Sequence, residues 1–192
     1  MRLFIGIPLA ATTTHDLGAI ADRLRSKTAS ESLLRWSAVE SWHITLQFLG
    51  STTPLQYECV TARLRELHQP PVVVELGAVD TFDRTGVLFV DVRVTSQLVA
   101  LQQAVTAATT PCGFVPESRP YHPHITLARR RGKSDGRELR SLKLQIDQQS
   151  NIPSFTADSF LLYESTPTPE GSRYELRECF PLDGRLPDNL SR

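Results

Sequence analysis

The sequence predicts a bilobal α+β protein in which two antiparallel β-sheets, related by a pseudo-twofold axis and flanked by helices, face each other across a central cleft. The first observation is that β-like stretches and stretches of helical periodicity follow one another with short connections. The second is that a similar order of strands and helices occurs twice along the chain. The third is that the tetrapeptide HITL occurs at residues 43–46 and again at residues 124–127.

The composition argues against a protein with a strong overall charge and against a membrane protein. The 192 residues suit one bilobal domain over residues 1–192, and the 40% of apolar residues can fill its core. The 21 basic and 21 acidic residues balance, so an anionic ligand needs a local cationic patch rather than a global field. No apolar run approaches the roughly 18 residues that predict a membrane span. We therefore expect no membrane partner. The expected state is a monomer in the cytoplasm.

The cysteines support the same compartment. Cys59, Cys112 and Cys179 are three in number, widely spaced and without a CxxC pair. An odd number without a pattern is typical of reduced thiols in the cytosol. We therefore expect no disulfide.

The first half of the chain alternates between strands and helices. In order, we expect a strand over residues 2–8, a helix over 11–28, an extended stretch with a turn over 35–50, and a helix over 53–69. A threonine of residues 12–14 would cap the first helix, and Pro54 suits the start of the second. His68 would lie at the end of the second helix, where the helix dipole favours a histidine.

The second half repeats this order with more strands. In order, we expect strands within residues 70–94, a helix over 96–110, an extended stretch over 122–129, a weaker helix over 134–149, and two strands within 154–182. Ser96 would cap the helix at 96–110. Proline and glycine in the last stretch indicate a turn between its two strands.

The two HITL segments each present one polar face. Side chains alternate along a strand, so His43 and Thr45 share a face, as do His124 and Thr126. The isoleucine and leucine of each segment lie on the other face and would anchor it in the core. If the two strands face each other, two imidazoles and two hydroxyls converge on one cleft.

This set of groups suits the cleavage of a phosphodiester. The reaction needs a base to activate the attacking oxygen and an acid to protonate the leaving oxygen, and imidazole titrates near neutral pH. Threonine hydroxyls can donate to the phosphate oxygens. A single HxT on a strand is typical of a structural histidine, but two copies in equivalent places favour a joint site.

Other residues near the second HITL have competing interpretations. His122 and His124, in the sequence HPH, could both ligate a metal, but no Cys, Asp or Glu cluster lies nearby. His122 is better explained as a residue that supports the catalytic groups from behind or lies at the rim of the cleft. Arg129 ends the strand, and the basic residues that follow it are typical of a solvated loop that enters a helix: Arg130, Arg131, Lys133, Arg137 and Arg140.

The chain resembles the 2H phosphoesterases, whose signature is two HxT motifs. Within them it is most similar to the bacterial and archaeal RNA 2′,3′-cyclic phosphodiesterases, also called 2′–5′ RNA ligases. The segments that carry the resemblance are RLFIGIPL, RWSAVESWHITLQFLG, HPHITLAR and LLYESTPTPEGSRYELRECFPL. The chain departs from the family before the first motif, where Ser37, Ala38 and Trp42 replace the usual proline and Asn-Leu.

The resemblance implies a role for each candidate residue. His43 would donate a proton to the 3′ oxygen and His124 would activate water, which leaves a 2′-phosphate. Thr45 and Thr126 would hold the phosphate. The partner would be RNA with a 2′,3′-cyclic phosphate end, and no metal or other cofactor is implied.

Two further residues have a function by the same resemblance. Arg129 matches the arginine that closes the second family motif and would contact the phosphate or stack on a base. Phe48 could stack on a base, but strict alternation puts it on the core side unless the strand has a bulge.

Three alternatives to RNA hydrolysis stay open. The same fold could act on a small cyclic nucleotide such as an ADP-ribose cyclic phosphate. The reverse reaction would ligate 2′,3′-cyclic and 5′-hydroxyl ends. An RNA-binding module without catalysis is the third, although both HxT motifs are intact.

Overall fold

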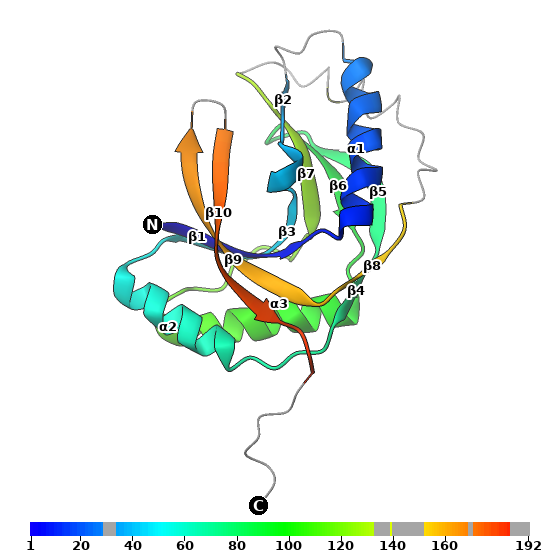
Figure 1. Ribbon diagram of the computed structural model, residues 1–192. Coiled ribbons are helices and arrows are strands. Elements are labelled where there is room, and N and C mark those ends of the chain that lie inside the picture. The colour runs from blue at the N-terminus through cyan, green and yellow to red at the C-terminus, as the bar shows by residue number, and fades with distance from the viewer. Residues whose placement is uncertain (29–33, 133–138, 140–151, 169–170, 185–192) are drawn as a thin grey trace, which may run out of the picture.

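The computed structural model describes residues 1–28, 34–132, 139, 152–168 and 171–184. In chain order the elements are β1 Arg2–Pro8, α1 Ala11–Ser26, β2 Leu34–Trp36, the 3-10 turn η1 Val39–Ser41, β3 His43–Ser51, α2 Pro54–Arg65, β4 Val72–Val74, β5 Leu76–Phe82, β6 Val87–Val92, α3 Ser96–Thr109, the 3-10 turn η2 Thr110–Cys112, β7 His124–Arg130, β8 Phe155–Ala157, β9 Ser159–Thr168 and β10 Gly171–Pro181 (Figure 1).

The strands form two four-stranded sheets and a two-stranded ribbon. The order is β10-β9-β1-β3 in the first sheet and β2-β7-β6-β5 in the second, and β4 pairs with β8. All the pairs are antiparallel. The predicted α+β class with two antiparallel sheets is therefore confirmed.

Each sheet takes strands from both halves of the chain. Strand β2, from the first half, pairs with β7, and β9 and β10, from the end of the chain, extend the sheet of β1. The two HITL strands also differ in position, because β3 is an edge strand and β7 is internal. The repeat in the sequence therefore does not correspond to one sheet for each half.

The two helix caps proposed from the sequence are wrong. Helix α1 begins ahead of the threonines: Ala10 is the capping residue, has no side-chain cap, and its carbonyl accepts from the Thr14 amide at 2.9 Å. The cap of α3 is Thr95 instead of Ser96, because Thr95 is the extended residue and its hydroxyl accepts from the Leu98 amide. Sequence alone does not separate neighbouring hydroxyl residues at a helix start.

The start of α2 agrees with the prediction, whereas its end does not. Thr53 and Gln56 form a capping box and Pro54 follows in the first turn. The helix ends at Arg65, so His68 lies beyond its last turn and not at the helix end where the dipole would favour a histidine.

Of the helices in the described ranges, none is long and apolar enough to cross a membrane. The expected helix at 134–149 falls, apart from Leu139, outside the described residues.

One cluster of buried apolar side chains joins both four-stranded sheets and the three helices. The apolar residues of the HITL segments belong to it: Ile44, Leu46, Ile125 and Leu127 are at most 3% exposed. Each such side chain contributes about 1.5–3 kcal/mol to stability by leaving water. The core therefore fixes both strands from their rear faces. That residues 1–192 act as one unit stays a prediction.

The expectation of three free thiols is wrong for two of them. Cys59 of α2 and Cys112 of η2 form a disulfide with a Cα–Cα distance of 5.7 Å, although 53 positions separate them. Packing of α2 beside η2 brings these residues together, and their spacing in the sequence gives no sign of it. Cys179 is free and exposed.

Candidate active site

The two HITL strands carry their histidines and threonines on their partly exposed faces. His43, Thr45, His124 and Thr126 are all partly exposed, whereas the residues between them are buried. Strands β3 and β7 lie beside each other although they belong to different sheets. The positive charge of one histidine therefore acts on the other and lowers the pKa of His43. The two predicted histidines are thus near each other, and each threonine shares the partly exposed face of its strand with one of them.

A tyrosine joins the two strands at this point. The Tyr121 hydroxyl donates to the carbonyl oxygen of Thr45 at 3.1 Å. Burial raises the pKa of Tyr121, so the phenol stays protonated and can donate this bond. The contact ties the backbone ahead of β7 to β3.

Each histidine is held in the same way by a backbone carbonyl. His43 Nδ1 lies 2.7 Å from the carbonyl oxygen of Ser41, and His124 Nδ1 lies 2.9 Å from that of His122. A carbonyl only accepts, so Nδ1 carries the proton in both rings and Nε2 of the neutral imidazole is free to accept one. Both rings therefore have the tautomer that a general base requires.

Aromatic rings surround His43. The rings of Phe4, Tyr174 and Tyr163 have centroids 4.6, 5.2 and 5.8 Å from that of the imidazole. Burial among them is the main cause that lowers the pKa of His43 to about 4, with smaller contributions from His124 and Arg129. Burial also raises the pKa of Tyr163 to about 12. With no ligand bound, His43 is therefore neutral at neutral pH.

The surroundings of His124 are more polar. Its ring packs edge-on against Phe82 and Phe89, with centroids 5.1 and 5.3 Å away. Burial lowers the pKa of His124, and the positive charges of His122 and Arg129 lower it further, whereas Asp91 raises it. Asp91 is the register partner of His124 in β6. The two histidines thus occupy chemically different environments.

His122 lies beside Asp91 and is exposed; its part in the site stays a prediction. Its Nε2 is 3.1 Å from Oδ1 of Asp91, and its side chain is 53% exposed. Among the residues that the structure describes, no three His, Cys, Asp or Glu side chains lie together as a group that could hold a metal ion.

Phe48 lies on the cleft side of β3, and its assignment to the core side by strict alternation is wrong. The register with β1 shifts twice, so that Leu46 and Gln47 are both buried and the alternation is inverted after them. Phe48 is 70% exposed and its ring lies 6.0 Å from that of Phe4. Its function as a base platform stays a prediction.

Arg129 lies on the cleft side of β7. Leu127 and Ala128 are both buried, and a register shift with β6 at this point leaves the next residue exposed. Its positive charge contributes to lowering the pKa of both His43 and His124. Arg131, by contrast, is exposed beyond the strand and precedes Gly132, whose φ is +67°.

Several residues of the site were not predicted from the sequence. Phe4, Tyr163 and Tyr174 come from β1, β9 and β10, and only the order of strands in the sheet gathers them around His43. Asp91 gave a signal that could have been used, because it is an acidic residue within an otherwise apolar strand.

Comparison with known protein families identifies the relatives of this chain. A family model described as the 2′-5′ RNA ligase superfamily matches residues 15–167. A Bacillus subtilis protein named RNA 2′,3′-cyclic phosphodiesterase is 28% identical over 84% of this chain and 86% of its own length. An Aeropyrum pernix protein of the same name is 30% identical over 71% of this chain and 79% of its own.

Solved structures share the fold at lower identity. Escherichia coli LigT in its apo form superimposes with a TM-score of 0.77 at 23% identity, covering 95% of this chain and 97% of that one. TT0787 of Thermus thermophilus superimposes with a TM-score of 0.74 at 21% identity, covering 97% and 100%. Both support the described arrangement of sheets and helices.

Proposed function

The chain belongs to the 2′-5′ RNA ligase superfamily, and we propose that it hydrolyses RNA 2′,3′-cyclic phosphate ends to 2′-phosphomonoesters by metal-independent acid–base catalysis with two histidines. The observation that carries the proposal is the pair of imidazoles on facing strands, each anchored through Nδ1 to a carbonyl. Both then keep Nε2 for proton transfer. The names of the curated relatives support the choice of substrate.

The proposed reaction uses each imidazole once. Nε2 of His124 takes a proton from water, whose oxygen forms a bond to phosphorus. The bond between phosphorus and the 3′ oxygen breaks, and Nε2 of His43 gives its proton to that oxygen. The products are a 2′-phosphomonoester and a free 3′-hydroxyl. One proton has then passed to His124 and one has left His43, and exchange with solvent restores the starting state.

To act as the acid, His43 must be protonated, and the site without a ligand disfavours the protonated form. The pKa of His43 is lowered to about 4, chiefly by burial. A bound phosphodiester brings a negative charge into the same dry environment, and an opposite charge nearby favours the imidazolium. We therefore propose that the substrate itself raises the pKa of His43 and loads the acid on binding.

The neighbouring groups would stabilise charge on the phosphate. The hydroxyls of Thr45 and Thr126, each two residues after a histidine, would donate to the non-bridging oxygens. Arg129 would add a charge-assisted hydrogen bond. Phe48, on the same face of β3, would stack on the base of the terminal nucleotide.

Ligation is the second proposed activity of the same site. If the 5′-hydroxyl of another RNA replaces water, the same proton transfers join the ends, and microscopic reversibility allows the reverse cleavage. The name of the family favours this candidate. A small cyclic nucleotide as the natural substrate remains the alternative.

The direct test is turnover of a 2′,3′-cyclic mononucleotide in EDTA, with the product identified by phosphorus NMR against both isomers. We expect undiminished turnover and a 2′-phosphate. Activity that disappears with EDTA and returns with a metal would contradict the metal-independent mechanism. A 3′-phosphate would mean that the acid faces the 2′ oxygen, and no turnover would support a binding module.

A further inference from the structure

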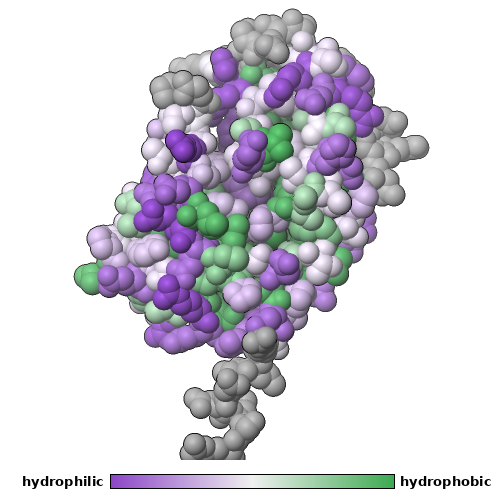
Figure 2. All heavy atoms as spheres, viewed as in Figure 1, coloured by the Kyte–Doolittle hydropathy of each residue, from purple (hydrophilic) through white to green (hydrophobic). Residues whose placement is uncertain are grey.

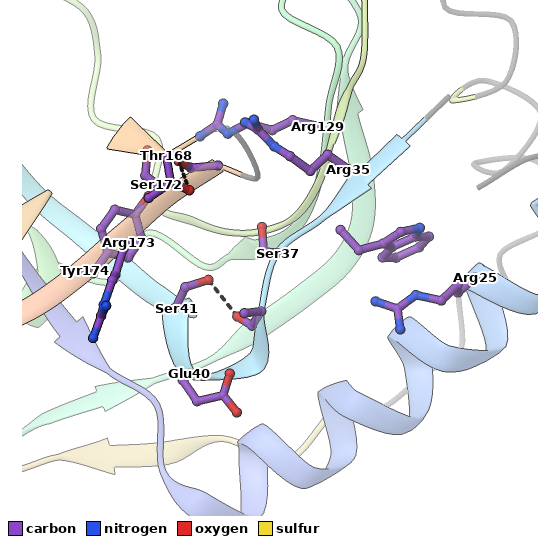
Figure 3. A pocket seen from close by; sticks show the side chains of 13 residues that line it. Arg25, Arg35, Ser37, Glu40, Ser41, Arg129, Thr168, Ser172, Arg173 and Tyr174 are labelled. Carbon is purple, nitrogen blue, oxygen red and sulfur yellow. Dashed lines mark hydrogen bonds between the residues drawn. The ribbon is translucent and has the colours of Figure 1, made fainter. Parts of the chain in front are cut away.

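A cationic groove opens next to His43, although none of the four polar HITL residues lines it. Its volume is about 550 Å³, and its lining includes Arg25, Arg35, Arg129 and Arg173, with Glu40 as the one acidic residue among the described lining (Figure 3). Hydrophilic residues surround the hollow between the β9–β10 hairpin and β2 (Figure 2). The groove meets the site at Ser41, whose carbonyl holds His43, and at Tyr174, whose ring contacts His43.

Two of these arginines lie directly opposite each other. Arg35 of β2 is the register partner of Arg129 of β7, and cross-strand partners share a face of the sheet. Like charges in this position are destabilising, and no carboxylate of the described residues lies within ion-pair distance of either one. Such a pair is typical of a site whose charge balance is completed by an anion.

The β9–β10 hairpin forms the opposite wall. Arg173 and Tyr174 of β10 line the groove, and Gly171 begins that strand. A Cβ at Gly171 would lie 3.5 Å from Nε of Arg35, so the absence of a side chain there leaves space beside this guanidinium. Figure 3 shows Arg35 and Arg129 extending toward this hairpin.

The remaining arginine, Arg25, lies on α1 and is less available to bind a ligand. The guanidinium of Arg25 lies over the ring of Trp36 at 5.3 Å from its centroid and is 3.9 Å from Asp22. It therefore adds positive potential to the groove, while Arg35, Arg129 and Arg173 keep donors for a ligand.

We propose that this groove binds the RNA chain on the 5′ side of the reacting end, with Arg35 binding the backbone phosphate next to the reacting phosphate that Arg129 contacts. The proposal rests on the proposed function. A 2′,3′-cyclic phosphate is the last group of its strand, so all the remaining nucleotides leave the site through the 5′ oxygen. A groove that is continuous with the site and rich in arginine fits a chain of phosphates. The protein then prefers an oligonucleotide to a mononucleotide.

The test compares two substrates at low and at high salt. For the wild type and for Arg35→Gln, kcat/KM is measured on a cyclic mononucleotide and on a short single-stranded RNA with the same end. We expect Arg35→Gln to lower kcat/KM on the RNA roughly tenfold, as for a lost charge-assisted contact. The loss on the mononucleotide should be much smaller, and the difference should shrink as salt screens the contact.

Two further variants test the other wall of the groove and control for the loss of a positive charge elsewhere on the protein. Arg173→Gln removes a cation from the other wall and should act in the same direction. Arg63, on α2 and outside the groove, is 53% exposed, and Arg63→Gln should leave both substrates unchanged. An equal fall on both substrates for Arg35→Gln, or an RNA-specific loss for Arg63→Gln as well, would overturn the groove proposal.

Binding measured without turnover separates this proposal from the proposed function. Fluorescence anisotropy of a labelled RNA with a 2′-phosphate end should show roughly tenfold weaker binding by Arg35→Gln. If the wild type hydrolyses neither substrate but binding depends on Arg35, the hydrolysis fails and the groove stands. If hydrolysis occurs and binding is independent of Arg35 and Arg173, the groove fails alone.

Discussion

Phe48 of β3 and Arg129 of β7 occupy equivalent positions, each five residues after its HITL histidine and each exposed on the histidine's face. Both strands have a register shift at the leucine of the HITL segment, and this shift inverts the alternation that follows. One strand therefore presents an aromatic ring to the cleft and the other a guanidinium. This asymmetry suits a ligand with a base at one end and a phosphate at the other.

Arg129→Ala is expected to impair even the smallest substrate. Arg129 is exposed on the same face of β7 as His124, and its positive charge acts on both histidines, so we expect it to contact a phosphate bound there. Loss of a charge-assisted hydrogen bond should cost about 1.5–3 kcal/mol in kcat/KM on a cyclic mononucleotide. Steady-state kinetics check this.

Arg131→Ala is the matched control for this substitution. Arg131 is exposed beyond the end of β7, so its loss should leave the mononucleotide reaction unchanged. On an oligonucleotide it should weaken binding only in a salt-dependent way. Equal effects of the two substitutions on the mononucleotide would show that Arg129 contributes only general electrostatics.

His43→Ala and His124→Ala should each lower kcat by about 10² to 10⁴, the usual contribution of a general acid or base. The double variant should be little worse than either single one, because the two side chains act as a unit. The pH–rate profile of the wild type should be bell-shaped. Near-wild-type kcat in either single variant would rule out the two-histidine mechanism.

The lowered pKa of His43 predicts how stability depends on pH. Its folded-state pKa is about 4, below the ordinary value of 6.5, so between these values the unfolded chain binds more protons than the folded one. This contribution to stability is complete above pH 6.5 and decreases as the pH falls toward 4.

Denaturant titrations at several pH values between 4 and 7 measure this slope. As the pH is lowered from 7 to 4, the free energy of unfolding of the wild type should decrease more steeply than that of His43→Asn. His15 is exposed on α1, and His15→Asn serves as the control that should keep the wild-type slope. An unchanged slope in His43→Asn would show that another group is responsible.

Gly6→Ala should crowd the side chain of His43. Gly6 pairs with Thr45 across β1 and β3, and a Cβ there would lie 2.9 Å from the carbonyl oxygen of Ile44 and 3.3 Å from Cδ2 of His43. We expect a loss of about 1–3 kcal/mol in stability from overpacking, together with a lower kcat as the imidazole is displaced.

Gly18→Ala is the same chemical change but should raise stability instead of lowering it. Gly18 is inside α1 and a Cβ there meets nothing within 4 Å. The substitution should raise stability by about 0.5–1 kcal/mol, since alanine is the better helix former. Denaturation curves of both variants and kcat of Gly6→Ala test the pair; a stable, fully active Gly6→Ala protein would contradict the predicted crowding.

The disulfide predicts a specific pattern of thiol reactivity. Without reductant, an alkylating reagent should modify Cys179 alone, and Cys59 and Cys112 should react only after reduction. Intact-mass measurement gives the number of modified thiols. Reduction should cost about 2–4 kcal/mol of stability, because the bond closes a long loop of the unfolded chain. Modification of all three thiols without reductant would disprove the bond.

The sequence by itself was enough to predict the α+β class and the face of the strand on which each of the four polar HITL residues lies. Period-two alternation is local, so His43 and Thr45 had to share a face, and the repeat at His124 and Thr126 paired the two motifs. The buried partners Ile44 and Ile125, both 0% exposed, follow from the same alternation.

Only the tertiary structure decided which side chains surround these residues. The bulges that turn Phe48 and Arg129 toward the cleft arise from pairing with β1 and β6, strands that are distant in the chain. The pairing of Arg35 with Arg129 and the disulfide between Cys59 and Cys112 likewise join distant segments. A local pattern fixes the face of a residue within its own strand, whereas register and contact depend on which strand becomes its neighbour, and the packing of the whole chain determines that.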